Sequence, residues 1–294
     1  MHSSSACTPL PQNISRVIRQ RARTFYLASL FLPAHMRRDV HLIYTYFRTI
    51  DDLVDAPPEG CSNTMLLTEL DEWQVRFESG ETEPGTLLEG VFEVAKRHHI
   101  PYEYMTLILR GARTDINLSV METRQDLLDY SVCVAGSVGV VMAHIMGTPH
   151  DAALEAARDL GVAMQITNVL RDVGEDVQRG RVYLPLHDLR RHGCSLDSVR
   201  GGQVTSAFRD VMLDLMADAR AHYASGMGGI RYLDRPAQFS IYLAATLYSR
   251  ILDKIERHDF DVFSRRAHLS SVEKWSLAVP AYMEHRQVSR RPIT

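Results

Sequence analysis

Scarce cysteine and the absence of a long apolar run set the first limits on this sequence of 294 residues. Its four cysteines, Cys7, Cys61, Cys133 and Cys194, are scattered without a CxxC pair or the spacing of a zinc site. They predict reduced thiols rather than a disulfide framework, as in a cytoplasmic protein. No stretch approaches the roughly 18 apolar residues of a spanning helix. The polar segment 1–12 also lacks the apolar core of a secretory signal.

Charge of one sign is not in excess either. The net charge is −3 and the isoelectric point is near 6.5, so no nucleic-acid partner is predicted. Apolar residues make up 45% and charged residues 23%, which is typical of a globular chain with a substantial core.

Strand alternation is nearly absent, and helical periodicity prevails along the chain. Proline and glycine separate the periodic segments, as at Pro33, Pro57-Pro58 and Gly201-Gly202. We expect helices near 13–31, 36–55, 64–79, 85–98, 101–118, 124–146, 150–174, 203–226, 238–258 and 271–285, and a short helix ending at Gly193. The pattern predicts one all-α domain over residues 1–294, frayed at 1–12 and 287–294.

Two acidic ladders are the most informative feature of the chain. Asp51 and Asp55 form one, and Asp172 and Asp176 form the other. Residues four apart lie on one face of a helix, where like charges repel by roughly 0.2–0.5 kcal/mol per pair. Hard cations such as Mg²⁺ take oxygen ligands and are usually shared with substrate phosphates. The ladders therefore predict two helices that face each other across Mg²⁺ and a diphosphate, although a solvated acidic helix end is the alternative for an isolated DDxxD.

Neighbouring residues extend both ladders. Tyr44 and Arg48 precede the first at helical spacing, and arginine is suited to bidentate phosphate contacts. Gln165 and Asn168 share the face of the second, with Arg171 one position away. Apolar residues cover most other sides of that helix, so its polar stripe is expected to line an interior cavity.

The first helix carries further candidates for a diphosphate and an apolar chain. Arg21 and Arg23 are placed to close on a diphosphate, and solvated surface is the alternative. Phe25 and Ser29 are four residues apart and so share one face. They are candidates to line an apolar channel, with core packing as the more common role. A small Ser29 would leave room for a C20 rather than a C15 chain.

Four segments in this order resemble the squalene/phytoene synthase family. They are RARTFYL at 21–27, YTYFRTIDDLVD at 44–55, YSVCVAGSVG at 130–139 and QITNVLRDVGEDVQRGRVYLP at 165–185. The last segment is the most specific, and the sequences of the four segments are most similar to those of bacterial and plant phytoene synthases. One departure is that Tyr130-Ser131-Val132 stands where relatives often read Tyr-Cys-Tyr, so a second aromatic is missing.

The resemblance implies a helical isoprenoid-synthase fold around a central cavity. Its implied metal ligands are Asp51, Asp55, Asn168, Asp172 and Asp176. Its implied substrate-binding residues are Arg21, Arg23, Phe25, Ser29, Tyr130, Val134, Gln165, Asn168, Arg171, Tyr183, Tyr248 and Arg265. Tyr44 and Arg48 join the four ladder aspartates as implied catalytic residues, and Val134, Ala135 and Gly139 would form a close-packed helix beside the prenyl chains.

The implied reaction is the Mg²⁺-dependent head-to-head condensation of two geranylgeranyl diphosphates to phytoene through a cyclopropylcarbinyl diphosphate. Mn²⁺ is the alternative metal, and no NADPH is expected. The alternatives are a squalene or dehydrosqualene synthase acting on farnesyl diphosphate, a class I terpene cyclase and a non-catalytic helical lipid-binding subunit. The expected location is the cytoplasm at the edge of a membrane, with downstream carotenoid enzymes as partners.

Overall fold

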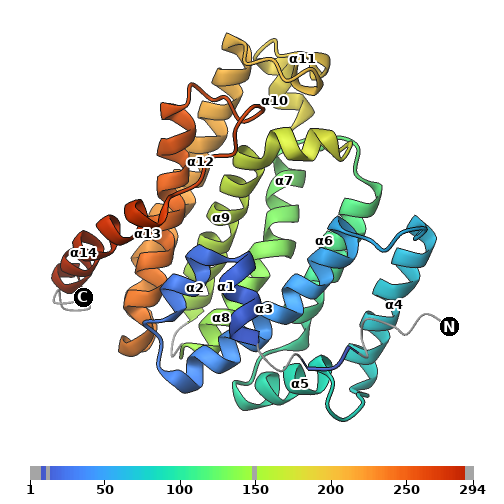
Figure 1. Cartoon of the computed structure of the whole chain (residues 1–294), viewed down its shortest axis with the longest axis vertical. Coiled ribbons are helices and arrows are strands. Elements are labelled where there is room, and N and C mark those ends of the chain that lie inside the picture. Colours follow the sequence, from blue (N-terminus) through green and yellow to red (C-terminus); the bar gives the residue numbers. More distant parts are fainter. Residues whose placement is uncertain (1–7, 11–13, 148–150, 289–294) are drawn as a thin grey trace.

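The computed structural model describes residues 8–10, 14–147 and 151–288 and shows a bundle of helices (Figure 1). The first half contains α1 (Ile14–Arg21), α2 (Arg23–Ser29), α3 (Ala34–Asp55), α4 (Asn63–Ser79), α5 (Leu87–Arg97) and α6 (Tyr102–Asn117). The second half contains α7 (Arg124–Ser131), the π-helical turn η2 (Val132–Gly136), α8 (Ser137–Ile145), α9 (Asp151–Gln178), α10 (Leu186–Arg191), α11 (Leu196–Arg200), α12 (Ser206–Gly229), the short 3-10 turn η3 (Ile230–Tyr232), α13 (Arg235–Arg257) and α14 (Ser271–Val288).

The described residues contain no strand and only two isolated β-bridges, Pro9 to Thr86 and Val120 to Val182. The predicted all-α, single-domain fold class is therefore confirmed. Local chemistry explains several helix starts. The Ser62 hydroxyl accepts a hydrogen bond from the Met65 N–H at the start of α4, and Thr123 and Asp126 form a capping box on α7. Such caps satisfy backbone donors that have no partner in the first turn.

Three details differ from the sequence expectation. The helix expected over 13–31 is interrupted at Ala22, whose φ of −132° leaves the helical region. Helix α11 has five residues, too few to show a period, and was not expected. Fraying does not extend to residues 8–10, because the Leu10 N–H donates to the Gly85 carbonyl and the Leu87 N–H donates to the Thr8 carbonyl. Most of the remaining expected fraying lies outside the described residues.

Helix α9 lies at the centre and packs against α8, α12, α13 and η2. Glycines let its backbone approach its neighbours. A Cβ added at Gly161 would lie 2.1 Å from the Ala135 oxygen, and one at Gly139 would lie 2.1 Å from the Ala157 oxygen. The close packing expected of Ala135 and Gly139 is thus present. Larger residues there would separate α8 and η2 from α9, the helix that holds the second ladder.

One continuous helical segment, Arg124–Ile145, is long and apolar enough to cross a membrane. The sequence expectation of no such segment rested on unbroken apolar runs, and polar residues interrupt this one. Of its most apolar stretch, 56% is buried inside the protein. It packs against α6 and α9, as core helices do, so length and composition alone are weak evidence for a membrane span.

Candidate active site

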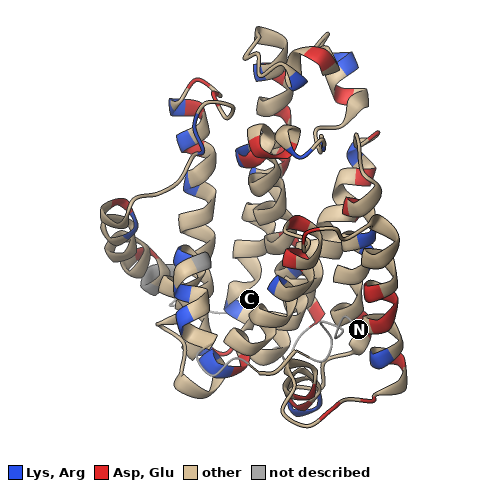
Figure 2. Ribbon diagram, turned by 45° about the vertical axis from the view of Figure 1, so that its right-hand side comes forward, with Lys and Arg blue, Asp and Glu red and all other residues tan. Residues whose placement is uncertain are grey.

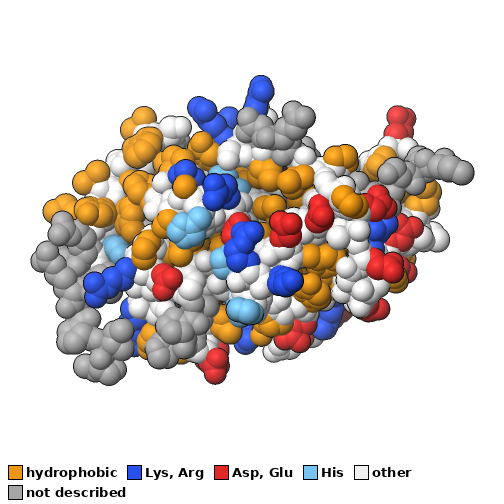
Figure 3. Space-filling view, turned by 90° about the horizontal axis from the view of Figure 1, so that it is seen from below, with side chains coloured by type: hydrophobic (Ala, Val, Ile, Leu, Met, Phe, Trp, Pro, Cys, Tyr) orange, Lys and Arg blue, Asp and Glu red, His pale blue; other side chains and the backbone are white. Residues whose placement is uncertain are grey.

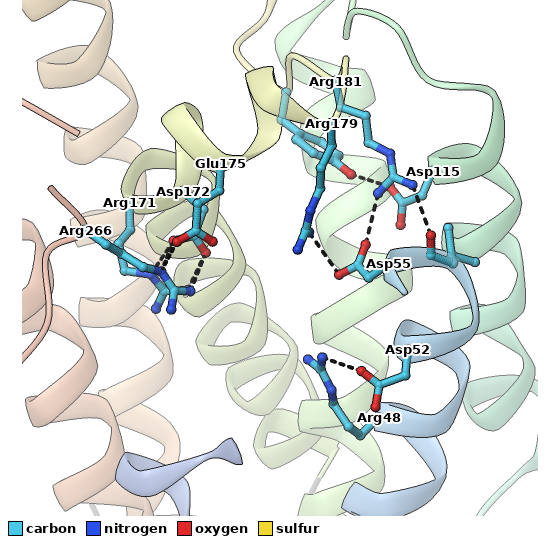
Figure 4. Close-up of polar contacts among 12 residues, drawn as sticks. Arg48, Asp52, Asp55, Asp115, Arg171, Asp172, Glu175, Arg179, Arg181 and Arg266 are labelled. Carbon is cyan, nitrogen blue, oxygen red and sulfur yellow. Dashed lines mark hydrogen bonds and ion pairs between the residues drawn. The ribbon is translucent and has the colours of Figure 1, made fainter. Parts of the chain in front are cut away.

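The two acidic ladders lie at the ends of α3 and α9, where acidic and basic residues come together (Figure 2). Figure 4 shows Asp55 on α3 and Asp172 on α9 on opposite sides of a space crossed by arginines. The Asp55 carboxylate is close enough to influence the pKa of Asp176, so the ladders are electrostatically coupled. The prediction that two helices present their acids to each other agrees with this geometry.

Asp51 occupies an unusual position on the first ladder. Its side chain is exposed, although many protein atoms surround it. The surrounding protein raises its pKa to about 7, and the carboxylates of Asp55 and Asp115 add to that shift against the influence of Arg48. Among the described residues it makes no hydrogen bond or ion pair. A cation or a proton is therefore needed to balance this carboxylate.

Asp52 and Asp55, the other acids at this end of α3, have arginine partners. Arg48 donates to Asp52 across 2.5 Å. Asp55 pairs with Arg181 at 3.0 Å and with Arg179 at 3.4 Å, and both arginines follow the end of α9 (Figure 4). These two partners were missed in the site prediction, although they stand within the sequence segment that resembles the family. They tie the first ladder to the end of the second.

Two guanidinium groups hold Asp172 on the second ladder. Arg171 donates from Nε across 2.7 Å, and Arg266 donates from Nε across 2.7 Å and from Nη2 across 3.0 Å. Burial opposes ionisation of Asp172, but these hydrogen bonds outweigh it and lower its pKa. Arg266 also pairs with Glu175 at 3.2 Å. The sequence pointed instead to Arg265, which the structure pairs with Asp261 at 3.6 Å.

Asp176 and Asn168 complete the second ladder without neutralising partners. Burial raises the pKa of Asp176 to about 7, with Asp172 and Asp55 adding to the shift against Arg179 and Arg181. The Asn168 Nδ2 donates to Gln165 Oε1 at 3.4 Å. The Asn168 Oδ1 is buried and has no hydrogen-bond partner in the described part of the chain. An unpartnered buried oxygen is unfavourable, and it suits a cation ligand.

These oxygens fit a hard divalent cation. Asp51, Asp176 and the Asn168 carbonyl supply the donor type that Mg²⁺ prefers, and their charge is not cancelled by neighbours. Across the described ranges, no three acidic, histidine or cysteine side chains converge enough to hold a metal by themselves.

A buried carboxylate with two tyrosine partners lies beside the first ladder. The Tyr183 hydroxyl donates to Asp115 at 2.6 Å and the Tyr130 hydroxyl donates at 3.1 Å. Burial raises the pKa of Asp115 to about 6, although both hydrogen bonds and Arg181 oppose the shift. Asp115 was not among the predicted residues, because no local motif marks it. Its carboxylate orients Tyr130 and Tyr183, which were among the predicted residues.

Residues from α9 and the loop after it line a narrow crevice that is too small to hold a water molecule. Its lining includes Val169, Val173, Asp176, Arg181, Val182, Tyr183 and Leu184. The crevice therefore brings an acid of the second ladder, an arginine and one predicted tyrosine to a common surface.

Tyrosines and apolar side chains form the wall between the ladders. Phe25 stacks on Tyr44, with ring centroids 4.6 Å apart and planes at 21°. Burial, together with nearby Tyr248, raises the pKa of Tyr44 to about 12. Tyr248 also lies close enough to Arg171 to influence its pKa, so it stands between the two helices. Val134 is half-buried and packs against both main core clusters.

The candidate residues near the N-terminus, Arg21, Arg23 and Ser29, differ in how exposed they are. Arg23 is exposed, and the side chain of Arg21 lies outside the described residues. Ser29 does not line open space. It is 2% exposed, and its hydroxyl lies 2.8 Å from His41 Nε2 and donates to the Tyr26 carbonyl. A phenylalanine at this position would overpack the contact with His41 rather than shorten a channel.

Known proteins that are similar to this chain include several phytoene synthases. Residues 18–273 match the family model described as squalene/phytoene synthase. A phytoene synthase of Thermus thermophilus is 38% identical over 92% of both chains. A 15-cis-phytoene synthase of Synechocystis is 35% identical over 88% of this chain and 80% of that one. The chloroplastic phytoene synthase 1 of Arabidopsis thaliana is 32% identical, and the match spans 64% of its length.

Solved structures show the same fold. A dehydrosqualene synthase in complex with ligand superposes with a TM-score of 0.84, at 26% identity over 93% of this chain and 95% of that one. A squalene synthase from Alicyclobacillus acidocaldarius superposes with a TM-score of 0.76, at 23% identity over 88% and 99% of the two chains. The family model spans most of the chain, and the Thermus relative matches it over nearly the whole length of both proteins. The chain belongs to the squalene/phytoene synthase family.

Proposed function

We propose that this protein is a phytoene synthase, a prenyltransferase of carotenoid biosynthesis. It condenses two geranylgeranyl diphosphates head to head, through a cyclopropylcarbinyl diphosphate, and releases two diphosphates. The observation that carries this proposal is the 38% identity with a phytoene synthase over 92% of both chains. The facing ladders support it, because each brings acids and arginines to one space.

The arginines between the ladders are suited to hold the leaving diphosphate. Arg48, Arg171, Arg179, Arg181 and Arg266 already bind ladder carboxylates. Guanidinium groups bind phosphate oxygens in the same bidentate manner, and such fixed charges stabilise a leaving group as its charge develops. A substrate diphosphate would therefore exchange places with some of these ion pairs when it binds.

Mg²⁺, or Mn²⁺ as an alternative, is proposed to bind with that diphosphate. Asp51, Asp176 and Asn168 would hold it through oxygens that have no partner among the described residues. Asp55 and Asp172, which arginines now hold, would join them. When bound it would offset negative charge on the leaving group. The chain's own contribution is to keep these oxygens together inside the bundle and to orient the diphosphate through its arginines.

The aromatic wall is suited to the carbocation. Phe25 and Tyr44 present stacked rings beside the first ladder, and ring faces attract cations. The raised pKa of Tyr44 keeps its hydroxyl neutral at pH 7. A neutral phenol is a weak base, which favours the released diphosphate as acceptor of the proton lost in the first half-reaction. Half-buried Val134 supplies an apolar surface that helps exclude water from the cation.

A dehydrosqualene or squalene synthase is the second candidate, because a solved dehydrosqualene synthase superposes with a TM-score of 0.84. Purified protein supplied with equal amounts of C15 and C20 diphosphates, with and without NADPH, separates the two. We expect a C40 product that does not depend on NADPH. A C30 hydrocarbon as the main product contradicts the phytoene proposal, and no product from either substrate contradicts the enzyme assignment. The cytoplasmic location and the downstream carotenoid enzymes stay predictions.

A further inference from the structure

Helix α14 carries an apolar stripe on its outer face. The exposed fractions are 79% for Val272, 57% for Trp275, 66% for Val279, 48% for Tyr282 and 61% for Met283. Their spacing of three or four residues puts them on one side of the helix. The opposite side is also apolar, since Ala278 and Ala281 are buried in a cluster with residues of α13. A helix that is apolar on two sides, with only one side covered by the described residues, needs a second apolar surface.

The stripe continues onto neighbouring elements. Tyr282 packs edge-on against Phe239 of α13, and Phe239 packs edge-on against Phe31. Leu30 and Phe31, in the turn after α2, are 42% and 40% exposed. Figure 3 shows hydrophobic side chains gathered toward the left of the view from below, the side on which α14 lies in Figure 1. The outer stripe, Leu30 and Phe31 together are called the α14 patch.

Positive charge borders this patch. Lys274 lies near Arg23 of α2, and desolvation together with that cation lowers the lysine pKa. The acids of α14 are engaged elsewhere, because Glu273 pairs with Lys254 at 2.7 Å and Glu284 accepts from the Tyr242 hydroxyl at 3.0 Å. Lys274 and Arg23 are therefore the described basic residues beside the apolar stripe.

We propose that the α14 patch docks the protein onto the surface of an anionic membrane. Valine, methionine and tryptophan would enter the boundary between headgroups and acyl chains, and the basic border would face anionic lipid headgroups. Trp275 and Tyr282 suit that boundary because each has an apolar ring and a polar tip. A second copy of the chain is the less favoured occupant, since lysine is depleted at protein–protein interfaces. The inference goes beyond the proposed reaction and does not depend on it.

Vesicle sedimentation of the whole chain tests the apolar part. The triple variant Trp275→Ser/Val279→Ser/Met283→Ser should bind vesicles of phosphatidylcholine with phosphatidylglycerol at least about tenfold more weakly than the wild type. The control Met65→Ser/Val75→Ser/Leu213→Ser changes three apolar residues that are 44%, 60% and 43% exposed but lie on α4 and α12. It should bind as the wild type does. Circular dichroism of both variants checks that they fold.

The basic border is tested separately. Lys274→Gln should weaken binding to the anionic vesicles about fivefold and leave the weaker binding to pure phosphatidylcholine unchanged. Lys96→Gln removes an exposed lysine from α5 and serves as its control. Trp275 also gives a direct signal, because the other tryptophan, Trp73, is fully buried. Its fluorescence should shift to shorter wavelength when anionic vesicles are added.

Two results would overturn the inference. One is vesicle binding of the folded triple variant equal to that of the wild type. The other is a wild type that ignores vesicles but self-associates through this face, so that the triple variant alone is monomeric in analytical ultracentrifugation. Turnover with detergent-dispersed substrate should be unchanged in the triple variant, and this readout separates loss of docking from loss of the proposed reaction.

Discussion

The two acidic ladders differ in which of their acids the protein neutralises. On the first, Asp51 has no hydrogen-bond or ion-pair partner in the described structure, while Asp55 is tied to Arg179 and Arg181. On the second, Asp172 is held by two arginines and Asp176 is not. Each ladder thus combines one carboxylate that arginines hold with one whose pKa is raised to about 7.

The difference separates two roles that the sequence pattern merges. Under the proposed function, a paired acid would position arginines for a diphosphate and contribute to stability. An unpaired acid would be unfavourable until a cation binds, so binding rather than folding would explain its presence. Substitutions at Asp51 and Asp172 should therefore have the same effect on turnover and opposite effects on stability.

The largest expected effect is on turnover. Asp51→Ala and Asp172→Ala should each lower kcat/KM by at least about a thousandfold, because each removes a carboxylate proposed to hold the cation that offsets the negative charge of the leaving diphosphate. Addition of EDTA to the wild type should have a similar effect, and helix content should stay near that of the wild type. Steady-state assays with a prenyl diphosphate provide the measurement. Near-normal rates in both variants, or full activity in EDTA, would show that the ladders are not the site.

The next effect is on the free energy of unfolding. Asp172→Asn should lower it by about 3 kcal/mol, because Arg171 would be left mostly buried without its carboxylate. Asp51→Asn should leave it unchanged or raise it slightly, since a carboxylate without a partner is removed. Urea unfolding followed by circular dichroism measures both. Equal losses of stability in the two variants would contradict the distinction between paired and unpaired acids.

Two adjacent arginines sharpen the comparison at the second ladder. Arg266→Gln should lower kcat/KM by about ten- to a hundredfold, because Arg266 binds Asp172 and Glu175. Arg265→Gln should change it by less than about threefold, because its partner Asp261 lies outside the ladder and exposed pairs contribute little. The reverse order of effects would restore Arg265 as the diphosphate contact implied by the family resemblance.

The last effect concerns stability at acid pH and a histidine behind the first ladder. His41 lies between the Ser15 and Ser29 hydroxyls, and burial, with Arg37 nearby, lowers its pKa to about 4. Between pH 6.5 and 4 the unfolded chain therefore binds a proton that the folded protein does not. The free energy of unfolding should fall across that range by up to about 3 kcal/mol.

His41→Asn should remove that part of the pH dependence, whereas His35→Asn, at an exposed position of the same helix, should retain it. Urea midpoints collected at several pH values from 7 to 4 give the comparison. A slope that persists in His41→Asn would assign the acid sensitivity to other groups.

Local patterns accounted for much of the fold and for part of the site. Periodicity located α3 and α9, and the four-residue spacing placed Asp51 with Asp55 and Asp172 with Asp176. The same patterns did not reveal Asp115, because its tyrosine partners come from other segments of the chain. They also suggested that Ser29 faces a channel, whereas a contact with His41 of α3 buries it.

The sequence by itself determined the helices, their apolar faces and the two acidic ladders, because these depend on residues within a few positions of one another. Only the tertiary structure decided which acids are neutralised, since Arg181 reaches Asp55 and Arg266 reaches Asp172 across long stretches of chain. It also decided that one apolar side of α14 faces outward. Spacing predicts that a helix has an apolar side, but the packing of neighbouring helices determines whether that side is covered.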